Sequence, residues 1–187
     1  ELQKAGVDSI NVSLDTLNED IYEKVTNKKL LQTVINGIDF AYNLGIPLKI
    51  NVVPQRGINE GCIFDLVNLA KDRNIDVKFI ELMPIGGMSD EDVIRNHEIF
   101  DRIEKKFGTL IADNESKGNG PANYYKISGY RGSVGFISAV HEKFCHECNR
   151  IRLTSTGLLK PCLCFEEGYD LRDALRNHAE SEGKIKD

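Results

Sequence analysis

Short apolar segments alternate with amphipathic segments through the first half of the chain. Strands rich in β-formers are predicted at 9–14 ("SINVSL"), 48–54 ("LKINVVP") and 77–83 ("VKFIELM"). Helices are predicted at 19–26, at 31–44, where Gly45 supplies a stop, and at 60–73. This β-α-β-α-β-α order, with about 30–35 residues per unit, predicts parallel strands joined by right-handed crossovers. Three such units form half a barrel or part of an open sheet.

The pattern changes to shorter segments after residue 85. The sequence "IGGMSDED" predicts a loop in which Ser89 caps a helix over 92–107 that ends at Gly108. Residues 109–139 read as short strands and turns around the glycine-rich loop "SKGNGPA". A hairpin with its turn near Thr156 and Gly157 follows, and a last helix, "YDLRDALRN", is capped by Asp170. The last ten residues are polar and are expected to fray.

Polar residues interrupt each of the three predicted strands. Asn11, Ser13 and Asp15 share one face of the first strand, and Lys49 and Asn51 share one face of the second. Glu81 continues the pattern in the third strand. Such residues fit a buried parallel strand only if they face a cavity, which would be the polar lumen of a barrel. Edge strands with one solvated face are the other interpretation, because alternation alone does not separate the two.

Four of the five cysteines lie within twenty positions, at Cys145, Cys148, Cys162 and Cys164. The C-x2-C spacing lets two thiolates reach one metal, as in a zinc ribbon with four cysteines. An iron–sulfur cluster would use four of them, or three with one iron left open. A disulfide is disfavoured in a chain of this kind. Spacing leaves the metal and the fourth ligand undecided, and Cys62 reads as a small buried apolar residue.

Two arginines follow the C-x2-C pair. Arg150 and Arg152 are at positions i and i+2 and so share one face of the strand. Guanidinium groups grip phosphates in a bidentate manner, which favours a multiply charged anion beside the metal site. The alternative is that both arginines lie on a solvated face of the hairpin.

Bulk composition narrows the classes of partner. The 187 residues, 41% of them hydrophobic, are enough for one domain with a core, and the net charge of −5 gives no basic field for nucleic acid. No apolar run approaches the roughly 20 residues that a membrane span needs, and no signal peptide opens the chain. Its beginning, "ELQKAGVDSINVSLD", reads as the end of a helix running into a strand, so a fragment or partial chain is expected.

Five segments carry a resemblance to a known family. They are, in chain order, "INVSLDTL", "LKINVVPQRGIN", "VKFIELMPIG", "RGSVGFIS" and "FCHECNRIRLTSTGLLKPCL". Together they closely resemble the GTP 3′,8-cyclase family, the radical S-adenosylmethionine enzymes of molybdenum cofactor biosynthesis, over roughly residues 2 to 178. The C-x2-C-N-R-x-R-L…P-C motif is highly specific within radical enzymes.

The resemblance implies an enzyme, a lyase that turns GTP into 3′,8-cyclo-7,8-dihydro-GTP by a radical route. The implied fold is α/β: an incomplete TIM-like barrel, of which residues 1–108 hold roughly the last three βα units. A C-terminal β-rich region, 109–187, would then carry the cluster and GTP-binding motif. The family has two [4Fe–4S] clusters, of which the N-terminal one cleaves S-adenosylmethionine and the C-terminal one meets the guanine of GTP through an open iron.

By the resemblance, the residues divide into three sets. The ligands of the C-terminal [4Fe–4S] cluster would be Cys145, Cys148 and Cys162; GTP would contact Lys49, Arg150, Ile151 and Arg152; S-adenosylmethionine would contact Ser13 and Met83. No catalytic residue is identified. The implied partners are GTP and a downstream cyclic pyranopterin monophosphate synthase in the cytoplasm, with no nucleic acid and no membrane, and a homodimer is left open.

The sequence also departs from the family pattern. The C-x3-C-x2-C motif of the first cluster, the glycine-rich segment that grips S-adenosylmethionine and the usual di-glycine C-terminus are missing, so this chain alone is expected to be inactive. Cys164 stands where the family usually has a bulky apolar residue, and Lys78 replaces a more usual arginine. Two alternatives stay open: a zinc-stabilised binding module that uses all four cysteines, and a related radical enzyme that acts on a peptide and holds auxiliary clusters.

Overall fold

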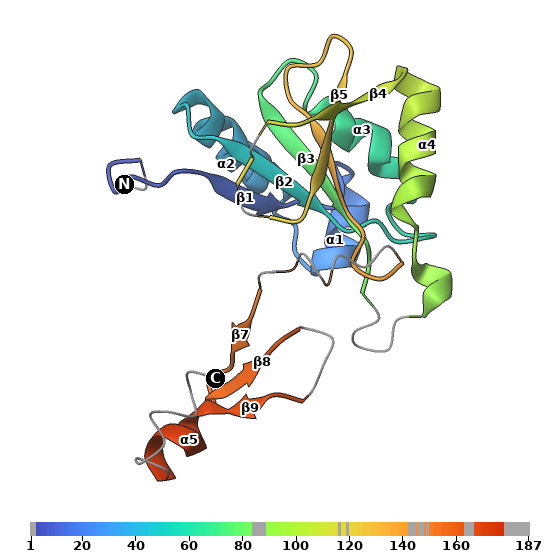
Figure 1. Ribbon diagram of the computed structural model, residues 1–187. Helices are drawn as coiled ribbons and strands as arrows, with labels where there is room; N and C mark the ends of the chain where they lie inside the picture. Colours follow the sequence, from blue (N-terminus) through green and yellow to red (C-terminus); the bar gives the residue numbers. More distant parts are fainter. Residues whose placement is uncertain are drawn as a thin grey trace. The chain divides into compact units, whose positions relative to one another are not determined.

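The computed structural model describes residues 3–83, 89–115, 117, 118, 120–141, 145, 148, 150–162 and 167–177. The chain divides into two compact units (Figure 1). Unit 1 comprises Glu1–Met83 and Gly87–Phe144, and unit 2 comprises Pro84–Gly86 and Cys145–Asp187. Cys164 and the C-terminal ten residues, both of which carried predictions, lie outside the described residues.

Unit 1 is built on a six-stranded sheet with the order β1-β2-β3-β6-β5-β4. Its strands are β1 (Ile10–Ser13), β2 (Leu48–Val52), β3 (Ile75–Ile80), β4 (Leu110–Asp113), β5 (Asn123–Ile127) and β6 (Val134–Ile137). The first three strands and β6 run parallel, while β5 and β4 complete the sheet in antiparallel pairing. The predicted parallel arrangement of the first three strands is therefore confirmed. The position of β6 beside β3 was not predicted.

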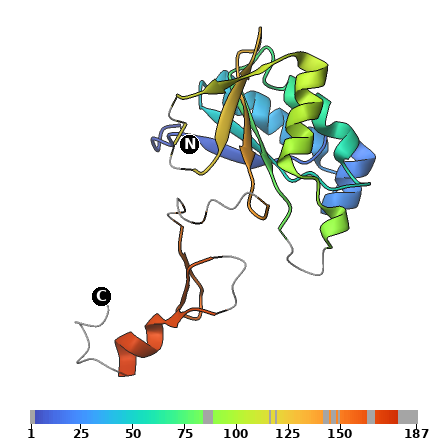
Figure 2. The same cartoon turned by 45° about the vertical axis from the view of Figure 1, so that its right-hand side comes forward.

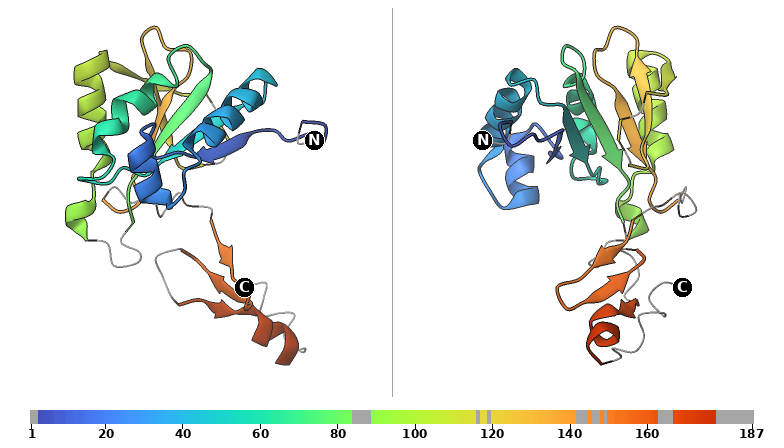
Figure 3. Two further views of the ribbon diagram at one scale, coloured as in Figure 1. Left: turned by 180° about the vertical axis from the view of Figure 1, so that it is seen from behind. Right: turned by 60° about the vertical axis from the view of Figure 1, so that its left-hand side comes forward.

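The helices of unit 1 pack on one face of this sheet. They are α1 (Glu19–Thr26), α2 (Leu31–Asn43), α3 (Ile63–Asn68) and α4 (Asn96–Phe107), with 3₁₀ turns η1 (Glu60–Cys62) and η2 (Asp90–Asp92). The ribbon views show the helices on that face (Figures 2 and 3). Alternate residues of the central strands, such as Ile50 on β2 and Val77 on β3, are fully buried in one core with apolar residues of the helices. The other set of alternate residues, including Lys49 and Asn51, is only half-buried. One face of the sheet is thus apolar and covered by helices, and the opposite face is polar.

The helix predictions hold at α1 and α2 and need correction further on. The predicted helix at 60–73 keeps its apolar face, since Ile63, Leu66, Val67 and Ala70 are all buried. However, it begins as η1, and after α3 the chain continues with tighter bonds from each amide to the carbonyl three residues back. The predicted apolar positions are therefore buried even though the helix type changes along this segment.

The predicted helix at 92–107 begins at Asn96. Val93 and Arg95 have extended backbones, and Val93 pairs with Gln55 in an isolated antiparallel bridge, so this stretch cannot also be helical. Ser89 caps the short η2 turn rather than α4, and α4 ends before Gly108 as predicted.

Unit 2 is a small sheet followed by one helix. It contains β7 (Arg152–Leu153), β8 (Leu158–Lys160), β9 (Tyr169–Asp170) and α5 (Leu171–Asn177). Strands β7 and β8 pair in antiparallel fashion around the predicted turn, in which Gly157 has a φ of +89°. That this hairpin carries a cysteine cluster stays a prediction. Asp170 caps α5, because the amide of Asp173 donates to its Oδ1 at 2.8 Å. The third strand, β9, was not predicted.

The mixed α/β class with a parallel sheet is confirmed. Closure of these strands into part of a barrel stays a prediction, as does the domain boundary at residue 108. No helix in the described parts of the chain is long and apolar enough to cross a membrane.

Candidate functional site

The polar face of the unit 1 sheet brings together the residues predicted to face a cavity. Strand register places Asn11 beside Lys49, and Lys49 beside Asp76. One step further along the strands, Ser13 lies beside Asn51, and Asn51 beside Lys78. Because paired residues of parallel strands point to the same side, these side chains share one face. Ser13, Lys49 and Asn51 therefore lie on one face of the sheet, as the alternation predicted. The cavity that this face would line stays a prediction.

Glu81 takes a different position from the one predicted. It follows the last residue of β3, is only 1% exposed, and Lys78 supplies the β3 side chain beside Asn51 instead. The Glu81 carboxylate accepts hydrogen bonds from the amides of Val140 and His141 at 2.8 and 3.0 Å, and its Oε1 lies 2.7 Å from Nδ1 of His141. Glu81 therefore fastens the end of β3 to the segment that follows β6.

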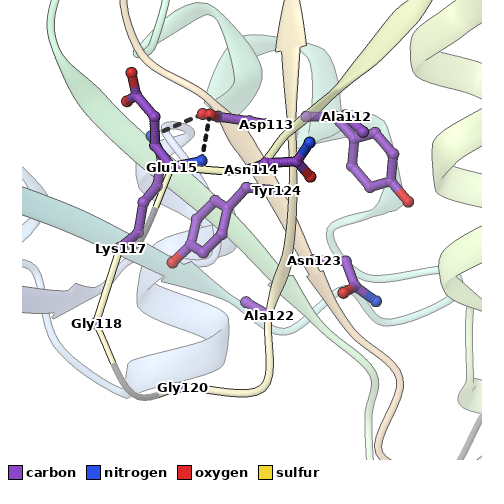
Figure 4. Close-up of a pocket in the computed structure, with 11 residues that line it drawn as sticks. Ala112, Asp113, Asn114, Glu115, Lys117, Gly118, Gly120, Ala122, Asn123 and Tyr124 are labelled. Carbon is purple, nitrogen blue, oxygen red and sulfur yellow. Dashed lines mark hydrogen bonds and ion pairs between the residues drawn. The ribbon is translucent and has the colours of Figure 1, made fainter.

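A buried charge cluster lies on the same polar face. The Lys117 ammonium donates to Asp76 at 2.7 Å and to the Ser133 hydroxyl at 2.9 Å. It also forms an ion pair with Asp113 at 3.2 Å (Figure 4). Ser133 in turn donates to Asp113 at 2.7 Å. The ammonium thus has two hydrogen-bond acceptors and one further carboxylate partner. The three charged side chains are at most 12% exposed.

The cluster shifts the protonation equilibria of its members. Burial by itself raises the pKa of Asp113, but hydrogen bonds from Ser133 and the Glu115 amide, together with the Lys117 ammonium, lower it to about 2. Burial lowers the pKa of Lys117, and its bonds to Asp76 and Asp113 outweigh this and raise it. Both charged forms are therefore stabilised. Burial, with the negative charge of Asp76, raises the pKa of the neighbouring Tyr124 to about 12.

Lys49 contacts the same loop that carries Lys117. Its ammonium donates a hydrogen bond to the backbone carbonyl oxygen of Lys117. Gly118 follows with a φ of +100°, a conformation that favours glycine, and a Cβ built there would lie 3.5 Å from Nζ of Lys49. The backbone of this loop thus lies directly against the lysine predicted to bind GTP.

The two residues predicted to contact S-adenosylmethionine both lie in unit 1. Ser13 is exposed at the end of β1, and Met83 is half-buried three residues beyond β3. Next to Ser13 in register, the buried Oδ1 of Asn51 has no hydrogen-bond partner among the described residues. An unsatisfied buried acceptor is costly, so this position fits a ligand that donates a hydrogen bond. Contact of Ser13 and Met83 with S-adenosylmethionine stays a prediction.

The predicted cluster ligands lie in unit 2. Cys145 and Cys148 are exposed, Cys162 is half-buried, and none of the three is in a disulfide. The amide of Cys148 donates to the carbonyl of Cys145 at 3.3 Å. Three unpaired thiols suit a [4Fe–4S] cluster in donor chemistry. The described residues nevertheless contain no group of three or more His, Cys, Asp or Glu arranged to hold a metal ion.

Arg150, Ile151 and Arg152 are also exposed in unit 2, and 71% of Ile151 is accessible. Arg152 begins β7, and Arg150 precedes the strand. This exposure is compatible with both interpretations of the arginine pair. Cys62, by contrast, is buried beside the hydroxyl of Thr16 at 3.1 Å, so the prediction of a small core residue is confirmed.

Sequence reasoning missed the Lys117 cluster. Lys117 and Asp113 lie in and next to a loop that appeared only as glycine-rich, and Ser133 lies just before β6. Asp76 did carry a signal, since it precedes Lys78 by two residues in the same strand and so shares its polar face. Nothing local indicated that Lys117 would be its partner.

The sequence was compared with known proteins. Residues 75–187 match the family model described as Molybdenum Cofactor Synthesis C, and residues 1–70 match the Radical SAM superfamily. A "GTP 3',8-cyclase" of Clostridium perfringens is 41% identical over 177 residues, which cover 95% of this chain and 55% of the relative. A protein of the same name from Rippkaea orientalis is 46% identical over 184 residues, which cover 94% of this chain and 55% of the relative.

A further relative, "Molybdenum cofactor biosynthesis protein 1" of Drosophila melanogaster, is 40% identical over 191 residues, which cover 100% of this chain and 33% of the fly protein. The chain thus spans about half the length of the bacterial relatives that it matches. These matches confirm the resemblance seen in the sequence motifs. Since its model covers more than half of the residues, this chain belongs to the Molybdenum Cofactor Synthesis C family.

Proposed function

We propose that this chain acts in a GTP 3′,8-cyclase, a radical enzyme that converts GTP to 3′,8-cyclo-7,8-dihydro-GTP for molybdenum cofactor biosynthesis. One observation carries the proposal: relatives that bear this name are 41–46% identical over 94–95% of the chain. The order of the motifs along the sequence supports it. A downstream cyclic pyranopterin monophosphate synthase and a homodimer are the partners that the family resemblance adds.

The sheet of unit 1 would form part of an incomplete barrel, with the polar face toward the lumen. Its support is the row of Ser13, Asn51 and Lys78 opposite the helix-covered face. Such a lumen is where barrels of parallel strands place their chemistry. Ser13 and Met83 would contact S-adenosylmethionine, and the unsatisfied Oδ1 of Asn51 would accept a hydrogen bond from the ligand.

In unit 2, Cys145, Cys148 and Cys162 would hold a [4Fe–4S] cluster, which when bound offers an open iron to the guanine of GTP. Arg150 and Arg152 would bind phosphate oxygens in a bidentate manner, and their exposed positions leave both guanidinium groups accessible. Ile151, between them, would supply apolar contact. In unit 1, Lys49 would neutralise a phosphate as a point charge.

The chain by itself is expected not to cleave S-adenosylmethionine, because its sequence contains no C-x3-C-x2-C motif for the cluster that performs this step. Binding of a cluster and of GTP can be tested without turnover.

Anaerobic reconstitution with iron and sulfide tests the metal assignment. We expect a brown protein with about one four-iron cluster per chain, measured by iron and sulfide analysis and by electron paramagnetic resonance after reduction. Cys145→Ser, Cys148→Ser and Cys162→Ser should each lose the cluster. Cys164→Ser is the matched control and should retain it.

Other outcomes identify the alternatives. A colourless protein with tightly bound zinc, in which Cys164→Ser loses metal as severely as Cys162→Ser, would establish the zinc-stabilised module instead. Calorimetric titration with GTP addresses the substrate. Failure to bind GTP, together with binding of a peptide, would favour the related radical enzyme.

A further inference from the structure

Lys49 lies within reach of a second lysine whose own ammonium is engaged elsewhere. The Lys117 ammonium donates to Asp76 and Ser133 and forms an ion pair with Asp113. The centre of the Tyr124 ring lies 5.3 Å from the same nitrogen. These four side chains enclose the Lys117 ammonium, and the side chain is 11% exposed although it is a cation on the polar face of the sheet.

The backbone of Lys117 has a different contact. Its carbonyl oxygen accepts a hydrogen bond from the Lys49 ammonium, and among the described residues this is the only acceptor for Lys49. An ammonium has three donors, so two remain to bind oxyanions. A free lysine side chain samples many rotamers, and fixing its end removes that entropy cost from ligand binding.

The side chain of Lys117 is anchored on the sheet. Asp113 ends β4, Asp76 lies in β3 and Ser133 lies just before β6, so three separate segments of the sheet hold the Lys117 side chain. Gly118, with a φ of +100°, permits the turn that brings the chain against Lys49. The side chain thus fixes the place of its own carbonyl.

We infer that Lys117 is a positioning residue: its buried ion pairs with Asp76 and Asp113 hold its backbone carbonyl where that carbonyl orients Lys49 toward a phosphate of the substrate. The inference rests on the proposed function for the identity of the ligand, a nucleoside triphosphate. The orientation of Lys49 is independent of that identity. Lys117 itself would not touch the substrate.

Four variants test the inference. Lys117→Met removes the ammonium and keeps a stem of similar length, Lys117→Arg retains the charge, and Ser133→Ala removes one partner of the cluster. Lys126→Met is the matched control, because Lys126 also lies beside Asp113, at 3.6 Å, and has no contact with Lys49.

Two measurements are made on each variant. The first is the rate at which an amine-reactive ester acylates Lys49. The reaction is carried out on the folded chain, and the label on Lys49 is quantified by mass spectrometry of the peptide that contains it. The second is the affinity for GTP by calorimetry. For Lys117→Met we expect faster acylation of Lys49 and about tenfold weaker GTP binding. Lys117→Arg should keep the acylation rate of Lys49 and the affinity for GTP close to the wild-type values. Lys126→Met should match the wild type in both measurements.

Unchanged acylation of Lys49 in folded Lys117→Met, with GTP affinity intact, overturns the inference. Tighter GTP binding by this variant also overturns it, because the carbonyl would then compete with the phosphate for Lys49. Lys117→Met leaves the carboxylates of Asp76 and Asp113 without the Lys117 ammonium, which can prevent folding. In that case Ser133→Ala decides: we expect smaller changes in the same direction, faster acylation of Lys49 and weaker GTP binding. If the wild type does not bind GTP at all, the proposed function fails, while the acylation rates still decide the role of Lys117.

Discussion

Asp113 is the residue whose charge depends most clearly on its neighbours. Its pKa is about 2 in the folded chain, because Ser133, the Glu115 amide and Lys117 favour the carboxylate over the effect of burial. A carboxyl whose pKa is lowered on folding stabilises the native state above its unfolded pKa of about 4. This contribution is lost as the pH falls from about 4 toward 2.

We predict that Asp113→Asn lowers the free energy of unfolding at pH 7 by about 1–2 kcal/mol and flattens its decline between pH 4 and pH 2. The amide cannot carry the charge that Lys117 pairs with. Urea unfolding at a series of pH values, followed by circular dichroism, measures both effects. Asp101→Asn, at an exposed position on α4, is the control and should keep the wild-type slope. An equally steep decline in Asp113→Asn would contradict the assignment.

Two contacts lie at the ends of the paired strands β3 and β6 in unit 1. The Glu81 carboxylate, after β3, accepts hydrogen bonds from the amides of Val140 and His141, and it also contacts the imidazole of His141. At the other end of the strands, Gly132 allows a close approach, since a Cβ there would lie 2.0 Å from the carbonyl oxygen of Ile75. Both contacts hold a strand pair that is separated by more than fifty residues of chain.

For the first contact, we predict that Glu81→Ala destabilises the chain by about 2–4 kcal/mol, because it removes a carboxylate that is 1% exposed and accepts the amides of Val140 and His141. His141→Ala removes only one side-chain bond and should cost about 1 kcal/mol. Chemical denaturation of the two variants makes the comparison. Equal losses would show that the backbone bonds to Glu81 contribute little.

For the second contact, Gly132→Ala should cost more than about 3 kcal/mol or prevent folding, because the new methyl meets backbone that cannot move aside. The matched control is Gly37→Ala in α2, where nothing lies within 4 Å of the added carbon. That variant should be more stable by about 0.5–1 kcal/mol, as alanine is the better helix former. Thermal melts of the two proteins distinguish these opposite signs.

The whole molecule contains two units of very different core size. Unit 1 has a large cluster of buried apolar side chains that joins its sheet and helices. In the described part of unit 2, Ala174 is the single buried apolar residue, while Ile151, Leu153, Tyr169 and Leu175 are exposed. A small sheet with so little core usually needs a further source of stability, and metal binding by cysteines is one such source.

We therefore predict that amides of unit 2 exchange with solvent quickly in the metal-free chain and at least about tenfold more slowly after iron–sulfur reconstitution. Amides of β2 and β3 in unit 1 should be protected in both states, because their strands are buried. Hydrogen exchange measured by mass spectrometry compares the two states. Cys162→Ser is the control, since the protection gained by unit 2 should disappear in it. Protection of unit 2 without metal would refute the prediction.

Most local structure followed from the sequence alone. The apolar pattern predicted α1, α2 and the three parallel strands, Gly108 marked the end of α4, and Asp170 capped α5. These features depend on residues a few positions apart, so a pattern along the chain is sufficient to find them. The alternation of polar residues also placed Ser13 and Lys49 on one face of the sheet, since that needs only strand geometry.

The tertiary structure decided the contacts between distant residues. Lys117 pairs with Asp76 across 41 positions, Glu81 with His141 across 60, and Lys49 reaches the carbonyl of Lys117 across 68. The alignment of β6 beside β3 creates the first two, and no pattern within either segment specifies that alignment. The motifs of the sequence determined the family and the candidate ligands. Which side chains hold one another in place depended on strand order and register, because these alone bring separate segments within hydrogen-bonding distance.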